Sequence, residues 1–455
     1  MSSAPLVMKF GGSSVADAVC MKAVAGLVQK ALPSAPLVVL SAMGKTTDAL
    51  FRAARMAAQG QLEEAFEAHA SIIAHHRTTA AKLLGERAID LLQEIAKQGG
   101  ELATILTGLS MVRELSPRSM DAVACHGERL STLIFARYLA AEGIKVELAD
   151  ARRFVRTDAK SGSANPLPKA IAGLVAEHVT PHLGPGRVVV TQGYIGATTD
   201  GLVTTLGRGG SDYSAALLGA ALGATEVQIW TDVEGVLTCD PRVVPEAKPI
   251  PELSFAEAAE LAAFGAKVLH PATILPAVEA DIPVTVRSTM KPEGRFSVIR
   301  GDVKSGRAIT ALATRGPVAV VTVTSSRMLD QPGFLARLFD IFGRNDISVD
   351  LVATAEISVS MTVDNDAETD KALDEIRAFA SATLVRDRAI VAVVGEQLRS
   401  TPGIAARTFK ALGDLNVEMI SMGANEINLS LVLRKDDAPA ALRRLHAELL
   451  PGVES

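Results

Sequence analysis

The stretch LVMKFGGSSVADAVCMKAV, Leu6 to Val24, sets the fold class of the first part of the chain. Its apolar start predicts a strand over Leu6–Phe10, and the helical spacing that follows predicts a helix over Ala16–Ala31. Two glycines and two serines separate them. Glycines let backbone N–H groups approach an anion, and the start of a helix adds its dipole, so this turn is typical of a phosphate site. A turn whose glycines only permit the bend is the alternative, but it has no need for the charge of Lys9.

The alternation of short strands and longer helices continues through the first 300 residues. The predicted strands are Leu6–Phe10, Leu37–Leu40, Ile144–Leu148, Arg187–Thr191, Glu226–Trp230 and Val284–Val286. The predicted helices include Ala16–Ala31, Glu128–Ala141 and Ser211–Leu222. This pattern predicts an α/β domain over residues 1–300, in which helices cover a largely parallel sheet. Residues 49–115 are almost purely helical in pattern, and we expect them to form a helical insertion or lid on the sheet.

The stretch VVLSAMGKTTD, Val38 to Asp48, ends like a P-loop. A full P-loop needs a glycine five residues before the Gly-Lys pair, but that position is Val39. A β-branched residue in an apolar run belongs to a strand, so the half of the loop that would wrap the phosphates is missing. We therefore expect this strand to deliver Ser41 and Thr47 to a substrate, and we expect Lys45 to be replaceable.

Two further motifs indicate anion binding at strand ends. TTLGRGGSD from Thr204 has three glycines before a helix, and Ser211 or Asp212 could cap it. An ordinary capped turn is the alternative, but Arg208 can pair with a carboxylate. WTDVEGVLTCDPR from Trp230 follows another strand, and ligands of open α/β sheets lie at the carboxyl ends of strands.

Two more motifs are weaker on their own. FGAKVLHP places Lys267 near the end of a helix that begins at Phe255, where the alternative is a solvated lysine. HGERLSTL places Glu128 at the start of a helix, where it could be only a favourable charge in the first turn.

Composition narrows the classes of partner and compartment. The net charge is −5 and only 4% of residues are aromatic, so nucleic acid and anionic membranes are poor partners. The three cysteines are far apart and form no CxxC pair, and no apolar run is long enough to span a membrane. We expect a cytoplasmic protein. His69, His75 and His76 form a possible metal cluster, but without a carboxylate or cysteine at ligand spacing a solvated helix face is the better interpretation.

The last third of the chain contains a repeat. Shifted by 70 residues, the 32 residues from Pro332 lie on those from Pro402 with nine identities. Each copy has the pattern strand, Pro-Gly turn, helix, strand, strand, helix, which is most of a ferredoxin-like βαββαβ unit. We place the copies at residues 308–386 and 387–455. The second copy lacks a final strand, and Ala308–Ala313 is the obvious donor.

The motifs KFGGSS, SAMGKTTD, HGE, TTLGRGGSD, WTDVEGV, TCDPR and FGAKVLHP together resemble the amino-acid kinase family, and within it the aspartokinases. The repeats resemble the paired ACT domains that follow the kinase domain in that family. The helical insertion and HGE are most similar to the lysine-sensitive branch, and the monofunctional form is implied. The resemblance implies transfer of the ATP γ-phosphoryl group to the β-carboxylate of L-aspartate, giving 4-phospho-L-aspartate in the diaminopimelate route to lysine, threonine and methionine.

The resemblance also assigns roles to individual residues. Lys9 would stabilise charge on the transferring phosphoryl group, Asp212 would hold that lysine or a metal, and Mg²⁺ would bridge the phosphates of ATP. Arg208 would pair with the α-carboxylate of aspartate and Glu128 with its ammonium group. The implied substrate-binding residues are Ser41, Thr47, Glu128, Arg208 and Ser211. The implied nucleotide-binding residues are Lys9, Gly11, Gly12, Gly209, Gly210, Thr231, Asp232, Leu237, Arg242, Lys267 and Val268. Leu237 stands where relatives often have a tyrosine.

Feedback control by an amino acid is implied for the ACT pair. A turn at a helix N-terminus suits the carboxylate of an effector, and Asp350 could take its ammonium group. The implied effector-binding residues are Met328, Gln331, Gly333, Leu335, Val349, Asp350 and Glu356. Lysine is the favoured effector, although Asp330, Gln331 and Ala355 depart from the lysine-sensitive pattern. Alternatively, either copy is only a dimerisation surface, and a homodimer through the ACT domains is expected.

Two other functions remain open at this stage. The protein could be a kinase for another small carboxylate such as glutamate or N-acetylglutamate, although Arg208 together with Glu128 favours a free α-amino acid. It could also be an amino-acid sensor with an inactive kinase domain. The presence of Lys9, Arg208 and Asp212 argues against that second alternative.

Overall fold

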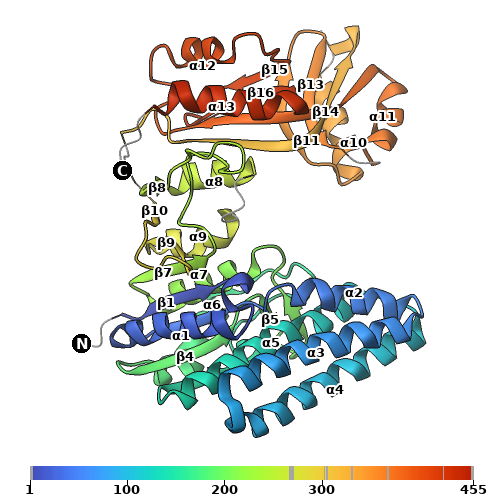
Figure 1. The fold of residues 1–455 in the computed structure, drawn as a ribbon. Helices are drawn as coiled ribbons and strands as arrows, with labels where there is room; N and C mark the ends of the chain where they lie inside the picture. The colour runs from blue at the N-terminus through green and yellow to red at the C-terminus, as the bar shows by residue number, and fades with distance from the viewer. Residues whose placement is uncertain are drawn as a thin grey trace. The chain divides into compact units, whose positions relative to one another are not determined.

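The structure is a computed structural model, and it describes residues 4–265, 271–301, 303, 306–328, 332–365, 368–423 and 425–451. Figure 1 shows the chain coloured from blue at the N-terminus to red at the C-terminus. Contacts divide this chain into two units. The first comprises Met1–Val236, Pro251–Phe255 and Val268–Asp302, and the second comprises Leu237–Ile250, Ala256–Lys267 and Val303–Ser455. The segments 237–250 and 256–267 therefore belong by contact to the second unit, although they lie inside the region predicted as the kinase domain.

An eight-stranded sheet forms the centre of the first unit, with the strand order β3, β4, β2, β1, β7, β9, β10, β8. All neighbours are parallel except β9 and β10. Its strands are β1 Leu6–Phe10, β2 Leu37–Leu40, β3 Lys145–Ala149, β4 Arg187–Gln192, β7 Glu226–Thr231, β8 Glu252–Ser254, β9 Val284–Ser288 and β10 Ser297–Arg300. β1 and β2 are buried along their whole length, because a parallel sheet is covered on both faces. The largely parallel α/β fold predicted from the sequence is confirmed.

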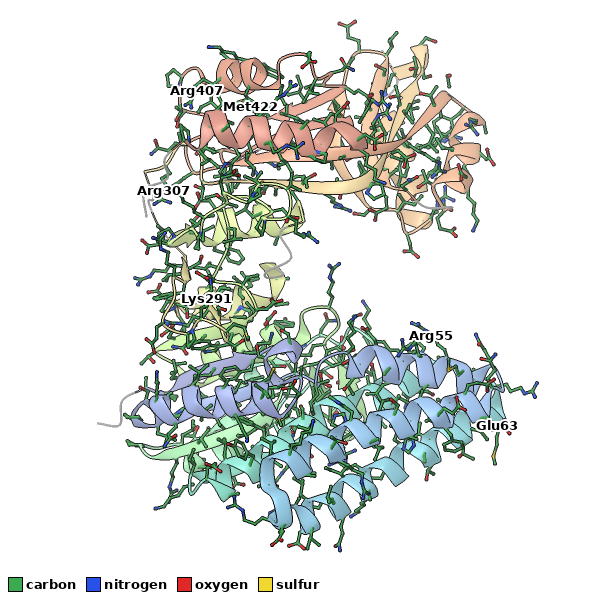
Figure 2. All side chains as sticks on the ribbon, viewed as in Figure 1. Arg55, Glu63, Lys291, Arg307, Arg407 and Met422 are labelled. Carbon is green, nitrogen blue, oxygen red and sulfur yellow. The ribbon has the colours of Figure 1, made fainter. Side chains whose placement is uncertain are left out.

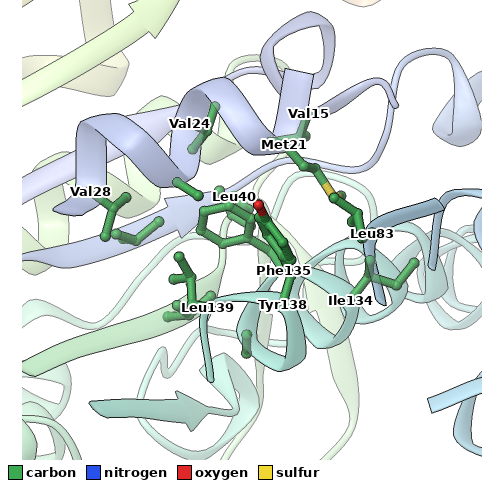
Figure 3. Packing of buried hydrophobic residues seen from close by; sticks show 14 of the residues in the cluster. Val15, Met21, Val24, Val28, Leu40, Leu83, Ile134, Phe135, Tyr138 and Leu139 are labelled. Carbon is green, nitrogen blue, oxygen red and sulfur yellow. The ribbon is translucent and has the colours of Figure 1, made fainter. Parts of the chain in front are cut away.

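Helices cover both faces of this sheet. They are α1 Ala18–Ala31, α2 Thr46–Ala58, α3 Leu62–Leu84, α4 Ile89–Val112, α5 Pro117–Ala141, α6 Pro168–His178, α7 Gly210–Leu222 and α9 Pro271–Glu279. Met21 of α1 and Phe135 of α5 share a buried cluster with Phe10 of β1 (Figure 3). Gly219 of α7 instead approaches Val7 of β1, whose side chain points to the other face because side chains alternate along a strand.

Helix α5 begins earlier than the sequence predicted. Ser116 caps it by accepting a hydrogen bond from the Ser119 N–H, and Pro117 occupies the first helical position, where its missing N–H does no harm. The prediction that Glu128 opens a helix is therefore wrong, since Glu128 lies in the middle of α5. That prediction followed the HGE motif and overlooked the Ser-Pro start signal eleven residues earlier. The short hairpin β5 Ile195–Ala197 and β6 Val203–Thr205 was also not predicted.

The predicted helical insertion consists of α2, α3 and α4. Its interior is made of small and aliphatic residues such as Ala53, Ala57 and Leu106. Arg55 of α2 and Glu63 of α3 point outward and are exposed (Figure 2). No helix among the described residues is long and apolar enough to cross a membrane.

The second unit contains a six-stranded antiparallel sheet in the order β12, β13, β11, β14, β16, β15. Its strands are β11 Ala311–Thr324, β12 Val349–Thr354, β13 Ser358–Asp364, β14 Ser381–Val394, β15 Met419–Met422 and β16 Asn428–Arg434. Its helices are α8 Phe255–Ala263, α10 Phe334–Arg344, α11 Glu368–Arg377, α12 Ile404–Leu412 and α13 Ala438–Leu449. The α10–α11 pair packs on a cluster of the first copy, and α12–α13 pack on one of the second copy.

The two copies share their longest strands. The first part of β11, Ala311–Arg315, pairs with Ile390–Val394 of β14. The second part, Val318–Thr324, pairs with β13 of the first copy. The segment Ala311–Arg315, which overlaps the predicted donor Ala308–Ala313, thus supplies a strand to the second copy, and among the described residues no strand follows α13.

Candidate active site

A cavity of about 530 Å³ lies in the first unit, where several strands of the sheet end. Its lining comes from the turn after β1, the turn after β2, helix α5 and the start of α7. The predicted site residues that line it are Lys9, Gly12, Ser41, Thr47, Glu128, Arg208, Gly209, Gly210, Ser211 and Asp212. The structure therefore brings every predicted substrate-binding residue and both predicted catalytic residues into one cavity.

Backbone hydrogen bonds join the turns after β1 and β2. The Gly44 N–H donates to the Gly12 carbonyl at 2.9 Å, and the Ser41 N–H donates to the Phe10 carbonyl at 3.1 Å. A Cβ at Gly12 would lie 2.8 Å from the Ala42 carbonyl oxygen, so only glycine permits this close approach. The stretch that resembled a P-loop thus forms one wall of the cavity together with the first glycine turn.

The Gly11 amide takes part in a backbone hydrogen bond between two strands' ends. Its N–H donates to the Trp230 carbonyl at 3.1 Å, which joins the turn after β1 to the end of β7. The proton of this amide therefore already has a backbone acceptor in this structure, and the role predicted for Gly11 at the nucleotide stays a prediction. Gly12 remains on the cavity wall.

Lys9 and Asp212 form an ion pair across the cavity. Lys9 Nζ lies 2.6 Å from Asp212 Oδ1, and only 10% and 13% of the two side chains are exposed. Lys9 comes from β1 and Asp212 from the first turn of α7. This pair places a cation next to a helix N-terminus, and both features favour a bound anion.

Helix α7 begins without a side-chain cap. Its N-cap is Gly209 in a left-handed conformation (φ 72°), and the helix starts at Gly210. The prediction that Ser211 or Asp212 caps the helix is wrong, because both lie inside its first turn. Their side chains are consequently available to the cavity.

Two charged side chains differ in their surroundings on the cavity wall. Arg208 is exposed and forms no ion pair with the described residues. Glu128 is buried, and its Oε1 accepts a hydrogen bond from the Ala42 N–H at 3.1 Å, whereas its Oε2 has no partner among the described residues. Burial raises the pKa of the Glu128 carboxyl to about 8. The cavity therefore offers an accessible cation and a buried carboxyl group, which is neutral below about pH 8 and whose second oxygen has no partner among the described residues.

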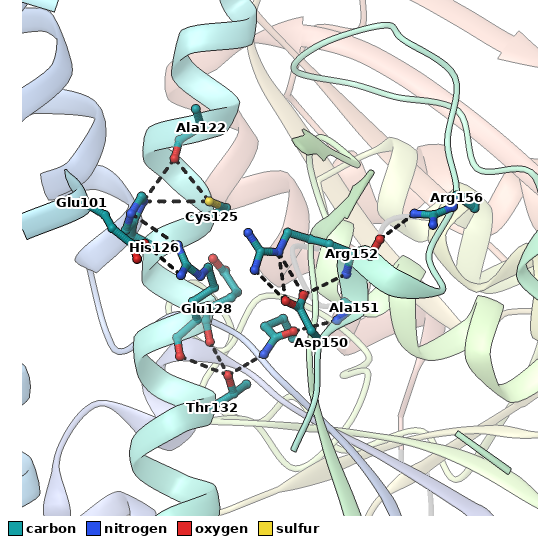
Figure 4. A network of polar contacts seen from close by, with 12 residues as sticks. Glu101, Ala122, Cys125, His126, Glu128, Thr132, Asp150, Ala151, Arg152 and Arg156 are labelled. Carbon is teal, nitrogen blue, oxygen red and sulfur yellow. Dashed lines mark hydrogen bonds and ion pairs between the residues drawn. The ribbon is translucent and has the colours of Figure 1, made fainter. Parts of the chain in front are cut away.

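Hydrogen bonds behind Glu128 fix the position of its helix turn (Figure 4). Thr132 Oγ1 donates to the Glu128 carbonyl at 2.7 Å and accepts from Gln192 Nε2 at 2.8 Å. Ser131 Oγ donates to the Ser41 carbonyl at 2.8 Å. These bonds tie α5 to β4 and to the turn after β2, so the carboxylate is held by rigid elements.

Comparison with known protein families identifies the family to which this cavity belongs. The amino acid kinase family matches residues 4–288, and the ACT domain family matches residues 321–378 and 391–449. The chain belongs to the amino acid kinase family. It is 39% identical to the lysine-sensitive aspartokinase 3 of Escherichia coli over 98% of this chain and 99% of that protein. It is also 39% identical to the chloroplastic aspartokinase 1 of Arabidopsis thaliana, over 97% of this chain and 79% of that protein.

Solved aspartokinases have the same fold. The structure of Escherichia coli aspartokinase III with aspartate and ADP matches with a TM-score of 0.85 and 38% identity, covering 98% of this chain and 100% of that one. The structure of that enzyme with lysine and aspartate matches with a TM-score of 0.82 and 39% identity, over 98% and 99% of the two chains. Within the amino acid kinase family, the chain is an aspartokinase by both sequence and fold.

Asp121 and Tyr194 are among the cavity residues of this amino acid kinase domain that the sequence did not predict. Asp121 is buried and accepts hydrogen bonds from the Gly162 N–H at 2.9 Å and from Thr205 Oγ1 at 2.6 Å. It precedes Glu128 by seven residues, about two helical turns, so a correct start for α5 would have placed both on one face. Tyr194 has a left-handed backbone (φ 68°), which is uncommon for a residue with a side chain, and no pattern in the sequence predicts it.

The residues expected at the nucleotide of an aspartokinase are not all in the cavity. Thr231 ends β7, and its Oγ1 donates to Asp232 Oδ1 at 3.0 Å. Leu237 and Arg242 belong to the second unit, where Leu237 bridges to Pro249 and the exposed Arg242 pairs with Asp240. Lys267 and Val268 lie outside the described residues. Helix α8 ends at Ala263.

The residues expected at the effector of an aspartokinase lie in the first ACT copy. Gly333 is the N-cap of α10, and Met328 and Val349 pack against the same apolar cluster. Leu335 and Glu356 are exposed. Asp350 lies on β12. Gln331 and Asp330 lie outside the described residues.

The three histidines of the helical insertion bind backbone carbonyls. His69 Nε2 contacts Gly99 O at 2.9 Å, His75 Nε2 contacts Ala16 O at 2.9 Å, and His76 Nδ1 contacts Ile72 O at 2.7 Å. His76 is fully buried and not on a solvated face, and burial lowers its pKa to about 4. Among the described residues, no group of three His, Cys, Asp or Glu side chains could hold a metal ion.

Proposed function

We propose that the protein phosphorylates L-aspartate on its β-carboxylate, with ATP as the donor. The observation that carries this proposal is the single cavity in which Lys9, Asp212, Arg208 and Glu128 meet. Phosphoryl transfer between two anions depends on positioning and charge stabilisation rather than on a covalent catalyst. Lys9, beside the N-terminus of α7, stabilises charge on the phosphoryl group. Arg208 and Glu128 match the carboxylate and the ammonium group of an amino acid.

The charges assign the orientation of aspartate. Arg208, with five N–H donors and no ion pair among the described residues, binds the α-carboxylate. Glu128 Oε2 receives the α-ammonium group, which replaces the missing hydrogen-bond partner. The hydroxyls of Ser41, Thr47 and Ser211 line the same space and hold the β-carboxylate. Glutamate, which is one methylene longer, and N-acetylated acids, which lack the ammonium group, fit this arrangement less well.

The reaction requires no proton transfer at the acceptor. A β-carboxylate oxygen attacks the γ-phosphorus, the bond from that phosphorus to the bridging oxygen breaks, and ADP leaves. Lys9 stabilises the charge on the transferring group, and Asp212 positions Lys9 through the 2.6 Å ion pair. The Asp212 carboxylate at the cavity wall is also a suitable ligand for Mg²⁺, a hard cation that binds carboxylates and phosphates together. When bound with ATP, Mg²⁺ neutralises phosphate charge.

Regulation and assembly form a second part of the proposal. Feedback inhibition by an amino acid, with lysine as the favoured effector, acts through the first ACT copy. Asp350 binds the ammonium group, and the N-terminus of α10 at Gly333 binds the carboxylate. The ACT copies, at residues 308–386 and 387–455, also form a homodimer. The free thiols of Cys20, Cys125 and Cys239 fit a reducing compartment such as the cytoplasm.

The deciding experiment traps the acyl phosphate with hydroxylamine. We expect hydroxamate to form with ATP, Mg²⁺ and L-aspartate, at much lower rates with L-glutamate, and not with N-acetyl-L-aspartate. Repeating the assay with added lysine, threonine or methionine identifies the effector. Hydroxamate formation from glutamate at an equal rate would overturn the substrate, and no hydroxamate from any acid would indicate a sensor without kinase activity.

A further inference from the structure

Arg315 occupies the point at which the two ACT copies are joined. It is the last residue of the β11 segment that pairs with β14 in the second copy, opposite Ile390. The register of that pairing shifts between Arg315 and Val318, where the strand passes into the first copy. Such an irregularity changes the direction of a side chain. The segment of β11 that pairs with the second copy thereby directs its last side chain, the Arg315 guanidinium, to carboxylates of the first copy.

Arg315 pairs with two carboxylates of the first copy. Its Nη1 lies 2.6 Å from Asp350 Oδ1, and its Nη2 lies 2.9 Å from Asp364 Oδ1. The Asp350 side chain is only 13% exposed, and its Oδ2 is buried without a partner among the described residues. Arg315 therefore neutralises Asp350 but leaves part of its hydrogen-bonding capacity unused.

The second copy shows that this cluster is not required by the fold. The repeat shift of 70 residues places Val385 opposite Arg315, Ile420 opposite Asp350, and Arg434 opposite Asp364. Val385 and Ile420 are apolar and exposed, yet β14 and β15 form as their counterparts do. Asp350 is the largely buried member of the cluster, with 13% of its side chain exposed. Covering its charge costs desolvation, so its presence in one copy alone indicates a use other than stability.

The strand that carries Arg315 also contacts helix α8. A Cβ added at Gly265, just after α8, would collide with the Thr314 carbonyl oxygen. Glu257 of α8 accepts a hydrogen bond from Thr310, and Glu260 accepts one from Asn425 at 3.2 Å. Movement of Arg315 would consequently reach α8 through its immediate neighbour in the chain.

We propose that Arg315 is an internal cation that occupies Asp350 until the ammonium group of an effector displaces it. Arg315 then sets both the affinity and the chemical selectivity of the effector site, because only a ligand with a positive charge can replace Arg315 as the partner of Asp350. When Arg315 is displaced from Asp350, it keeps its contact with Asp364. The irregular stretch of β11 between Arg315 and Val318 is then free to shift. This inference rests on the effector site under the proposed function.

L-lysine binding to the full-length chain, measured by calorimetry, tests the competition. Arg315→Ala removes the competitor, and we expect lysine to bind about threefold to tenfold more tightly, since a site that must first be vacated loses apparent affinity. Arg315→Lys keeps a cation and should bind lysine close to the wild-type affinity. Asp364→Asn loosens Arg315 without touching Asp350, and it should tighten lysine binding by a smaller factor.

Each result has a defined meaning. Unchanged or weaker lysine binding in both Arg315→Ala and Asp364→Asn, with the fold verified by circular dichroism, would overturn the competition. Asp364→Asn keeps the inference testable if Arg315→Ala does not fold. Failure of lysine, threonine and methionine to bind the wild-type chain, while hydroxamate still forms from aspartate, would overturn the effector site itself and leave the kinase proposal standing.

Discussion

The pair Lys9–Asp212 in the kinase unit and the pair Arg315–Asp350 in the first ACT copy have nearly the same local geometry. In each, a carboxylate oxygen lies 2.6 Å from a cation, and the aspartate side chain is 13% exposed. Their surroundings differ. Lys9 faces a cavity of about 530 Å³ that also contains Arg208 and Glu128, whereas Arg315 is shared with a second carboxylate, Asp364. A cation at the wall of a cavity can bind a ligand directly, whereas a cation held by two carboxylates can affect a ligand only when that ligand displaces it.

Removing the cation of the cavity should have the largest effect. We expect Lys9→Ala to lower kcat for hydroxamate formation by about 10² to 10⁴, because the transition-state charge loses its main partner. The exposed Lys22→Ala on α1 is the matched control. Full activity of Lys9→Ala would make this ion pair a structural one, like an ordinary buried salt bridge.

Arg208, which forms no ion pair with the residues that the structure describes, comes next. Arg208→Ala should raise KM for aspartate by about 10- to 100-fold with a smaller change in KM for ATP, which is the size expected for a lost charge-assisted pair. Arg118→Ala, exposed at the start of α5, serves as the control. An unchanged KM for aspartate would remove Arg208 from the substrate site.

Glu128 adds a pH dependence to the cavity. Its pKa of about 8 means that the neutral acid dominates below pH 8, and only the carboxylate can pair with the ammonium group of aspartate. KM for aspartate should therefore fall as the pH rises from about 6.5 to 8.5, and Glu128→Gln should raise KM and abolish this dependence. A pH-independent KM in the wild type would contradict the assignment.

The same pKa predicts an effect on stability. The folded state keeps a proton that the unfolded chain releases near its ordinary pKa of 4.5, so stability contributed by Glu128 is lost as the pH rises from that value through about 8. Glu128→Gln should therefore have a higher Tm than the wild type at pH 8 and nearly the same Tm at pH 4.5. Thermal unfolding monitored by circular dichroism at the two pH values measures this difference.

The regulatory pair should affect inhibition rather than turnover. Asp350→Ala should raise the lysine concentration for half-inhibition by about tenfold or more, as expected when an ammonium group loses a carboxylate partner. Ile420→Ala, at the equivalent position of the second copy, is the control and should leave inhibition unchanged. Equal effects of the two substitutions would erase the difference between the copies.

The smallest effect is expected at Lys45. It is exposed at the N-cap of α2 and does not line the cavity. Lys45→Ala should change kcat and KM by less than about twofold, as is usual for a solvated surface residue. A collapse of activity would reopen the P-loop interpretation of the stretch around it.

Much of the fold was predictable because its signals are local. The apolar runs of β1 and β2 were placed to the residue, and the repeat predicted the two ACT copies. The start of α5 was missed, and Asp121 was missed with it, because the Ser116–Pro117 cap was not used. Tyr194 could not be predicted, since its left-handed backbone reflects close packing against Gly210.

The sequence by itself determined which turns carry glycines, charges and hydroxyls, because turn chemistry and helix periodicity depend on neighbours in the chain. Only the tertiary structure decided which of these groups pair. In the folded chain the Gly11 N–H donates to the Trp230 carbonyl, and Asp350 forms an ion pair with Arg315. One Glu128 oxygen has no partner among the described residues. The physical reason is that the charge state and availability of a buried polar group depend on partners far away in sequence, which are specified only when the chain has folded.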